Sequence, residues 1–290
     1  MTGFYNKISS PEHIMVVDIE TIPDVSLAHE LCEIDSEASF SEQELRETMS
    51  SYHIEKHNGN PFLRQPFWNI VCLSYVLVKI TKNGDGTEFH EIVDVNSISS
   101  FKSSEKALLE KFWSLFNKYK PKLVTWNGAN FDVPVLKYRS MKYGISCSFF
   151  FQHGGKWDGY QSKYSAINID LMLLLSDYGS SAKLKLSEIC CMLAIPCKLG
   201  DNEGSKVSEF YDAQKYTEIR EYCETDVLAT YLVFARYCIL SGVLGVADYN
   251  NITEQIENLI IGSEKKGLKE FLQEWYRLSN NKIKLEKCDD

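Results

Sequence analysis

The chain has 290 residues, of which 44% are hydrophobic and 12% aromatic, and its formal net charge at pH 7 is -9. A chain of this size can bury a large core, as one enlarged domain or as one domain with an appendage. The longest apolar run, residues 70–78, is far shorter than the roughly 20 residues of a membrane span, and the start has no signal-peptide pattern. No CxxC pair occurs, so disulfides and a zinc site are not expected. We therefore expect a cytoplasmic protein without a membrane partner.

The negative charge is unevenly distributed along the chain. Residues 24–66 contain nine acidic and three basic residues, a net charge of -6, whereas residues 134–206 contain nine basic and six acidic residues, a net charge of +3. A basic surface is typical of proteins that bind nucleic acids, and the middle segment offers one. A solvated lysine face is an equally good interpretation of any single residue. The basic residues of this segment are Lys137, Arg139, Lys142, Lys156, Lys163, Lys183, Lys185, Lys198 and Lys206.

Hydrophobic periodicity predicts alternating strands and helices. In chain order we expect strands at residues 14–19, 70–80 and 88–95, a helix capped by Ser103 or Ser104, a strand at 122–126, a helix from about 132, a strand-like segment at 170–175, a helix at 186–193, a polar loop and a long helix at 217–240. The NGDG sequence at residues 83–86 is typical of a hairpin turn. This order indicates a mixed α/β sheet.

Three further segments have distinct compositions. Residues 24–60 are acidic and carry the capping-box pattern of Ser41 with Glu44, which predicts one or two helices inserted after the first strand. Residues 251–278 are amphipathic, so we expect them to pack on the core, with a partner-binding helix as the alternative. The loop at residues 149–168 is rich in aromatic residues, most of which we expect in the core. Tyr160 and Tyr164 either close the core or stack on nucleobases.

Four carboxylates in three separate motifs are the candidate catalytic residues. Asp18 and Glu20 lie in MVVDIETIPD, and Asp132 lies in VTWNGANFDVPVL. Asp226 lies in YCETDVLATY, with Tyr222 four residues before it. Because side chains alternate along a strand, Asp18 and Glu20 point to the same side. Clustered acids without a basic partner repel one another, and a divalent metal relieves that cost.

Each motif also has an interpretation without catalysis. An Asp-x-Glu at a strand end is usually solvated, and Asp132 can cap the helix that follows it. Tyr222 and Asp226, one helical turn apart, can be a core tyrosine and a surface acid. Three such coincidences in one chain are improbable, so the set favours a metal site.

The motifs DIETIPD, NGANFDVPVL, IDLMLLLSDYG and YCETDVLATY, in this order, resemble the tyrosine-type (DEDDy) branch of the DEDD 3′–5′ exonucleases, in the ribonuclease H-like superfamily. The likeness is greatest to the bacterial predicted exonucleases similar to the proofreading domain of family B DNA polymerases, and it covers residues 13–242. It implies an α/β fold with a ribonuclease H-like mixed five-stranded sheet flanked by helices. A helical insertion at residues 24–66 and a C-terminal helical extension with a polar tail at 243–290 complete the expected organisation.

Phosphodiester hydrolysis needs an activated water, neutralised phosphorane charge and a stabilised leaving oxygen, and two metal ions about 4 Å apart supply all three. The resemblance implies such an enzyme, with two Mg²⁺ or Mn²⁺ ions, acting on single-stranded DNA 3′ ends and releasing nucleoside 5′-monophosphates. The expected metal ligands are Asp18, Glu20, Asp132 and Asp226, and we expect Tyr222 to orient the attacking water. The expected substrate-binding residues are Ile19, Thr21, Asn127, Asn130, Phe131, Lys183, Lys185 and Tyr222.

Two alternatives stay open from the sequence. One is an exonuclease directed at RNA, and the other is a non-catalytic nucleic-acid-binding or regulatory module of a polymerase or repair complex. The complete set of acids favours catalysis, because a binding module has no need of four mutually repelling carboxylates. We expect no polymerase domain in this chain, so proofreading would require a DNA polymerase in trans.

Overall fold

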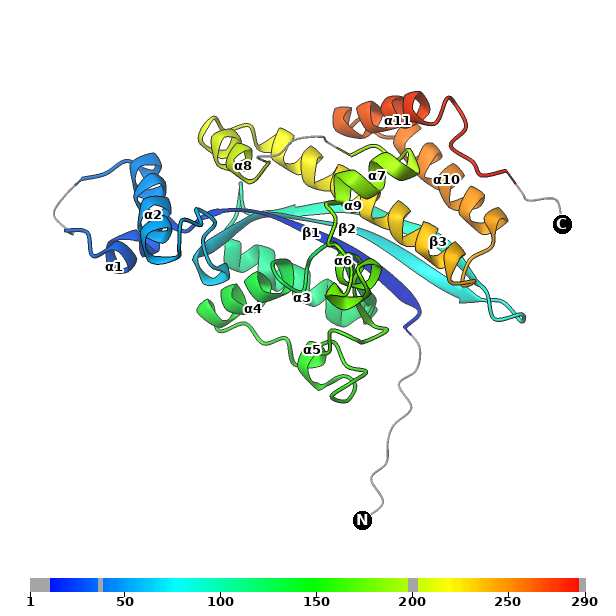
Figure 1. Cartoon of the computed structure of the whole chain (residues 1–290), viewed down its shortest axis with the longest axis horizontal. Coiled ribbons are helices and arrows are strands. Elements are labelled where there is room, and N and C mark those ends of the chain that lie inside the picture. Colours follow the sequence, from blue (N-terminus) through cyan, green and yellow to red (C-terminus); the bar gives the residue numbers. More distant parts are fainter. Residues whose placement is uncertain (1–10, 36–38, 198–202, 287–290) are drawn as a thin grey trace, which may run out of the picture.

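The computed structural model describes residues 11–35, 39–197 and 203–286, and a five-stranded mixed sheet runs through it (Figure 1). The strands are β1 (His13–Pro23), β2 (Trp68–Lys82), β3 (Glu88–Ser99), β4 (Lys122–Thr125) and β5 (Asn168–Asp170). Their order is β3-β2-β1-β4-β5. Strand β2 is antiparallel to β1 and β3, whereas β1, β4 and β5 are parallel. This confirms the predicted mixed five-stranded sheet.

Helices cover both faces of the sheet (Figure 1). On one face lie α9 (Tyr216–Leu240), α10 (Val246–Ile261) and α11 (Lys266–Leu278), and on the other lie α3 (Glu105–Tyr119), α4 (Asp132–Lys142) and α5 (Ser148–Gln152). The alternation of side chains along β1 explains why helices pack on both faces. Ile14 and Val16 are buried in the core shared with α9, whereas Met15 and Val17 are buried in the core shared with α3 and α4. Asp18 and Glu20 therefore continue the row that faces α9.

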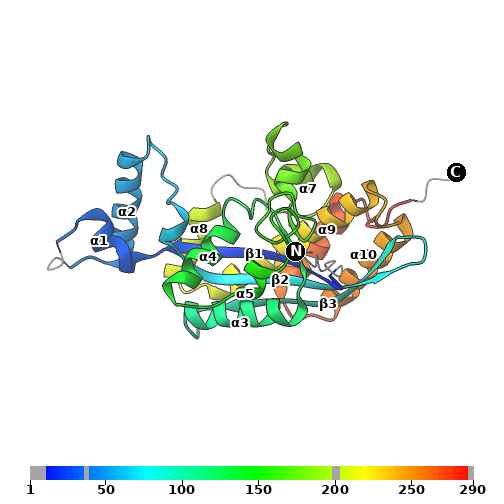
Figure 2. The same cartoon turned by 90° about the horizontal axis from the view of Figure 1, so that it is seen from below.

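The chain leaves the sheet after β1 and forms the predicted helical insertion at one end of the molecule (Figures 1 and 2). It contains α1 (Ala28–Cys32) and α2 (Glu42–Lys56), flanked by the short 3₁₀ turns η1 (Val25–Leu27) and η2 (Gln65–Phe67). The predicted capping box begins α2, since Glu44 N–H donates to Ser41 Oγ at 3.2 Å and Ser41 N–H donates to the Glu44 carboxylate at 2.7 Å. Arg46 of α2 pairs with Asp212 and so joins the insertion to the body.

The connections between the core elements follow the expected turn and capping chemistry. Asn83 N–H donates to Thr87 O at 2.8 Å across the β2–β3 hairpin, where Gly86 adopts a φ of 92°. Ser104 caps α3 by accepting from Ala107 N–H at 3.2 Å. The helix α7 (Leu186–Leu193) lies where the sequence predicts it.

Two segments differ from the sequence prediction. Residues expected in a polar loop form α8 (Glu203–Asp212), because Val207 and Phe210 pack with Ile22 of β1. The segment at residues 170–175 is not one strand. Strand β5 ends at Asp170, whose carboxylate accepts from Leu173 N–H and so caps α6 (Leu171–Leu175), which leads into the short turn η3 (Asp177–Gly179).

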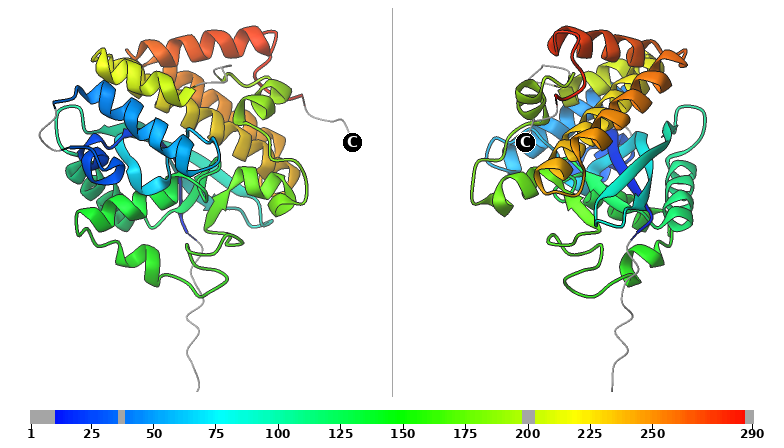
Figure 3. Two further views of the ribbon diagram at one scale, coloured as in Figure 1. Left: turned by 60° about the vertical axis from the view of Figure 1, so that its left-hand side comes forward. Right: turned by 90° about the vertical axis from the view of Figure 1, so that its right-hand side faces the viewer.

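The amphipathic C-terminal segment packs on the core, as the periodicity predicts. It forms α10 and α11, which lie along α9 (Figure 3). Ile252 and Leu268 are buried in the same core as the inner face of α9. Lys265, in the connection between α10 and α11, donates to Glu224 of α9 at 2.9 Å. Within the ranges given above, no helix has the length and apolarity needed to cross a membrane.

Candidate active site

The site begins at the outer end of β1, where the apolar row that faces α9 turns acidic. Asp18 is half-buried and Glu20 is 8% exposed, and they lie opposite Ser74 and Cys72 of β2. The pairing register shifts between Glu20 and Thr21, which is a β-bulge. Bulges often re-aim side chains near active sites, and this one ends the regular alternation directly after the second acid.

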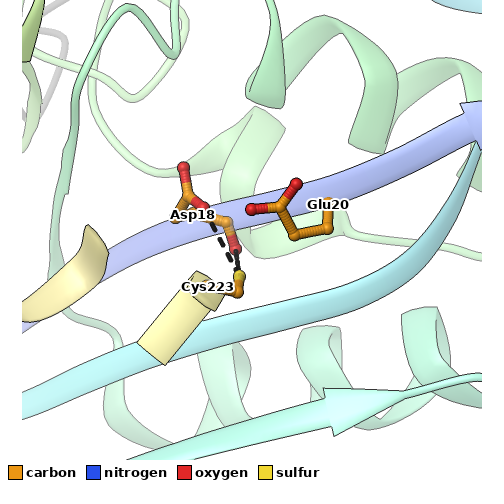
Figure 4. A group of neighbouring side chains, drawn as sticks. All are labelled: Asp18, Glu20 and Cys223. Carbon is orange, nitrogen blue, oxygen red and sulfur yellow. Dashed lines mark hydrogen bonds between the residues drawn. The ribbon is translucent and has the colours of Figure 1, made fainter. Parts of the chain in front are cut away.

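Helix α9 brings a thiol to the two carboxylates. The Cys223 thiol donates to the Asp18 carboxylate at 3.4 Å and lies 3.5 Å from the Asp18 main-chain oxygen (Figure 4). One ligand atom each from Asp18, Glu20 and Cys223 lie within 4.8 Å of one another. The sequence analysis did not single out Cys223. Its position next to Tyr222 and one helical turn before Asp226 is the signal that places it on the inward face of α9.

Tyr222 and Asp226 share this region of α9. Both are half-buried, and the main-chain oxygen of Tyr222 accepts from Thr225 Oγ1 at 2.8 Å. Asp226 acts electrostatically on both acids of β1, because its charge contributes to the raised pKa of Asp18 and of Glu20. The structure therefore brings α9 and β1 together as the motifs predict.

Asp132 reaches the cluster from the first residue of α4. Phe131, which precedes it, occupies the N-cap position without a side-chain cap, so Asp132 is not the helix cap that the sequence left as an alternative. The Asp132 side chain is 5% exposed, and its carboxylate accepts from its own main-chain N–H and from that of Ile19 on β1. Burial raises the pKa of Asp132 to about 7, although these two donors oppose the rise.

The carboxylates are held at high electrostatic cost. Burial first, then the charges of Asp132 and Asp226, raise the pKa of Asp18 well above its ordinary value. Burial and the charge of Asp18 do the same for Glu20. Among the residues that the structure describes, no lysine or arginine forms an ion pair with Asp18, Glu20 or Asp132. A buried set of oxygen ligands without a counter-ion fits a divalent cation.

A cavity of about 450 Å³ opens beside these acids. Its lining includes Asp18 and Asp132 together with four residues that the sequence assigned to the substrate, Ile19, Asn127, Asn130 and Phe131. It also includes three residues that the sequence analysis missed, Phe62, Gln65 and Trp126. Thr21 does not line this cavity and is buried beyond the bulge.

The missed residues come mainly from the segment that returns from the insertion. Gln65 Nε2 donates to Asn130 O at 2.8 Å, and the Phe62 and Phe131 ring centroids lie 5.4 Å apart. Trp68 closes the group, with its ring 4.9 Å from that of Phe62. Phe62 is 50% exposed, so part of this aromatic wall is open to solvent beside the cavity.

The turn before Asp132 has little conformational freedom. Asn127 adopts a left-handed φ of 60°, and a Cβ on Gly128 would lie only 2.2 Å from Thr125 Oγ1. Asp170 accepts from the N–H groups of Asn127 and Ala129, both at 3.0 Å. Asp170 therefore holds the turn that leads to Asp132, which is a supporting role for the site.

Only some residues of the predicted basic surface are exposed. Arg139 is 2% exposed and pairs with Asp24 and Glu105, so this residue is structural and was wrongly included. Lys142 is exposed, but it also pairs with Asp24. Most of the others are exposed, including the two assigned to the substrate, Lys183 and Lys185, neither of which lines the cavity. Lys198 lies outside the described residues.

The family model for predicted 3′–5′ exonucleases related to the exonuclease domain of PolB matches residues 60–275. Asp132, Tyr222 and Asp226 lie inside this match, whereas Asp18 and Glu20 precede it and reach the site through the pairing of β1. No curated protein matches the chain.

One matching solved structure is the family B DNA polymerase from the hyperthermophilic archaeon Pyrobaculum calidifontis, at 18% identity and a TM-score of 0.44. The match covers 82% of this chain and 25% of the polymerase chain. Because the family model covers most of the sheet and its helices, the chain belongs to the family of predicted 3′–5′ exonucleases related to the exonuclease domain of PolB.

Proposed function

We propose that this protein is a metal-dependent 3′–5′ exonuclease that hydrolyses phosphodiester bonds at the 3′ ends of single-stranded DNA and releases nucleoside 5′-monophosphates. The observation that carries the proposal is the meeting of Asp18, Glu20 and Asp132, with the charge of Asp226 acting on them, beside one open cavity. Family membership supports the same reaction class.

The metal ions that fit this donor set are Mg²⁺ or Mn²⁺, two per site, because carboxylate oxygens are the ligands these hard cations prefer. Asp18, Glu20 and Asp226 would hold one ion, and Asp18 with Asp132 would hold the other. When bound, the ions supply charge neutralisation for the phosphate and its leaving oxygen. The raised pKa values of Asp18, Glu20 and Asp132 support this assignment, because they reflect negative charge that the protein itself leaves unbalanced.

The chain's own residues bind and orient the substrate. Tyr222 is a poor base at neutral pH because a phenol has a pKa near 10, so its proposed task is to orient the attacking water through its hydroxyl. Asn127 and Asn130 present polar groups to the cavity, and the Phe62–Phe131 wall offers a surface for the terminal base. A DNA polymerase is the proposed protein partner.

The test compares DNA and RNA oligonucleotides labelled at the 5′ or the 3′ end, with Mg²⁺, Mn²⁺ or a chelator. We expect 5′-labelled DNA to shorten one nucleotide at a time and 3′-labelled DNA to release a labelled mononucleotide at once, with no reaction in the chelator. Faster degradation of RNA would redirect the proposal to that substrate. Absence of hydrolysis by wild type with either metal would contradict it and favour a binding module.

A further inference from the structure

Two exposed tyrosines lie side by side outside the catalytic cavity. Tyr164, in the loop before β5, is 51% exposed, and Tyr178, in the turn after α6, is 39% exposed. Their ring centroids are 4.7 Å apart and the ring planes are inclined by 56°. Leu175 and Leu184 nearby in sequence are also exposed. Grouped exposed apolar side chains commonly mark binding surfaces.

The backbone holds Tyr178 in this position at a cost. Asp177, Tyr178 and Gly179 have consecutive left-handed φ values of 49°, 56° and 96°. Non-glycine residues rarely adopt this conformation, and it persists only where surrounding contacts enforce it. Here Ser176 O accepts from Gly179 N–H at 2.9 Å and from Ser181 N–H at 3.0 Å. Strained backbone of this kind concentrates at ligand-binding sites, so the turn is a candidate for function.

Two lysines flank the tyrosine pair. Lys163 Nζ lies 4.9 Å from the Tyr164 ring centroid. A Cβ on Gly179 would lie 3.8 Å from Lys183 Cε, which places Lys183 beside the strained turn. Both lysines are exposed, and Asp177 is the acid next to them in the turn. A single nucleic-acid strand binds well to exposed aromatic rings with cations beside them, because its bases stack on the rings and its phosphates attract the cations.

One buried side chain connects this surface to the catalytic site. Asp170 accepts from Asn127 and Ala129 in the turn that leads to Asp132, and it also accepts from Leu173 N–H at the start of α6. Strands β4 and β5 are neighbours, with Thr125 paired to Asp170. The cavity wall and the turn that carries Tyr178 are therefore anchored at one point.

We propose a second contact site for the single strand, 5′ of the nucleotide held at the carboxylates; this proposal rests on the exonuclease function proposed above. The site consists of Tyr164, Tyr178, Lys163 and Lys183. The tyrosines stack on bases and the lysines attract phosphates. The site adds affinity only to strands long enough to reach it. It therefore makes binding depend on substrate length while leaving the chemical step unchanged.

The test uses a Tyr164→Ala/Tyr178→Asn double variant, since asparagine tolerates the left-handed backbone at this position. Three substrates are compared: the p-nitrophenyl ester of thymidine 5′-monophosphate, dT3 and dT20. We expect the KM for dT20 to rise roughly tenfold or more, which is the size of effect of removing base-stacking rings. Hydrolysis of the ester and the KM for dT3 should stay at wild-type values. A wild-type KM for dT20 in the double variant would overturn the proposal.

A second variant covers the case in which the tyrosine changes disturb the fold. Lys163→Ser/Lys183→Ser should lower the salt slope of dT20 binding by about 1.4, or about 0.7 for each phosphate that a lysine no longer neutralises. Tyr52→Ala is the matched control, because Tyr52 also has a lysine near its ring, Lys56 Nζ at 5.7 Å, but lies on the acidic insertion. It should change nothing. An unchanged salt slope in the lysine variant would also count against the site.

Failure of the second site and failure of the proposed function give different results. If wild type hydrolyses dT20 and the tyrosine variant matches it, only the second site is wrong. If wild type hydrolyses neither dT20 nor the ester, the exonuclease proposal is wrong. Fluorescence anisotropy of 5′-labelled dT20 in EDTA then still decides the binding surface, because wild-type affinity in the tyrosine variant would refute it.

Discussion

The molecule contains two groups of buried carboxylates, of which one is paired with cations and the other has no such partner among the described residues. Asp24 and Glu105 surround Arg139, with hydrogen bonds of 2.7 and 2.8 Å, and Lys142 donates to Asp24 at 2.6 Å. Burial alone would raise the pKa of Asp24, but hydrogen bonds from Lys142 and other donors lower it to about 2. This group links the start of the insertion to α3 and α4.

The second group, Asp18, Glu20 and Asp132, has no such cations in the described part of the chain. These acids meet a cysteine thiol and main-chain N–H groups. Burial raises the pKa of all three, and repulsion by neighbouring carboxylates, which is Asp170 in the case of Asp132, adds to the rise. The first group of buried acids thus has an arginine partner, whereas these three acids have none among the described residues. The difference fits a structural role for the first group and supports the proposed binding of a divalent cation by the second.

The largest expected effect is on catalysis, and it should appear only at the acids assigned to the metal ions. Asp18→Ala, Glu20→Ala, Asp132→Ala and Asp226→Ala should each lower hydrolysis by roughly 10³-fold or more, because each would remove a proposed metal ligand. Thermal melts of the metal-free variants should show no loss of stability, since repulsion is relieved. Glu91→Ala, at an exposed position of β3, is the control. One variant of the four that keeps most of its activity would remove that residue from the site.

The next effect concerns orientation of the attacking water. Tyr222→Phe should lower the single-turnover rate by roughly 10-fold to 1000-fold, because one positioned hydrogen bond in the transition state is lost. Binding of metal and DNA should change little, since the ring and its packing are kept. An unaltered single-turnover rate would show that Tyr222 acts only through its ring.

Substitutions in the group around Arg139 should change the stability of the protein rather than its catalysis. Arg139→Met leaves Asp24 and Glu105 buried without their main cation, and breaking a buried pair in this way costs about 3–5 kcal/mol. Urea unfolding measures this loss, and the rate per folded molecule should stay near that of wild type. Lys106→Met, which breaks the exposed pair with Glu110, should cost less than about 1 kcal/mol. Equal effects of the two substitutions would contradict the structural role of Arg139.

The last expected effect is a difference in the pH dependence of stability. The folded protein holds the Asp132 proton up to about pH 7, whereas the unfolded chain releases it near pH 4, so the free energy of unfolding should fall between these values as the pH rises. Asp24, with its lowered pKa, gives the opposite sign: its contribution is present above about pH 4 and is lost as the pH falls towards 2.

Urea unfolding in EDTA, measured across this pH range, tests both signs. Asp132→Asn should remove part of the decline between pH 4 and 7, and Asp24→Asn should reduce the loss of stability at low pH. If Asp132→Asn left the decline unchanged, the assigned pKa of that carboxyl would be wrong.

Local patterns were sufficient to place the candidate acids on their strand and helix. Period-two alternation places Asp18 and Glu20 on one side of β1, and the helical spacing of Tyr222 and Asp226 places them on one region of α9. The order of strands and helices predicted a mixed α/β sheet, and the family resemblance implied its five strands.

Contacts between segments that are far apart in the sequence could not be predicted from local patterns. Phe62 and Gln65 reach the cavity only because the insertion returns beside α4, and Arg139 finds its two acids in segments far from it in sequence. Helix α8 is stabilised by packing on β1 rather than by its own polar sequence, so tertiary contacts override the local pattern.

The central claim is that the carboxylates around Asp18 bind divalent cations. Calorimetric titration of the metal-free protein with Mn²⁺ tests it most directly, with Asp18→Ala and Asp24→Asn compared side by side. We predict saturable binding of two Mn²⁺ ions by wild type and by Asp24→Asn, and loss of both ions in Asp18→Ala, because Asp18 would be a ligand of both ions in the proposed site. Absence of saturable binding by wild type, or binding by Asp18→Ala equal to that of wild type, would contradict the account.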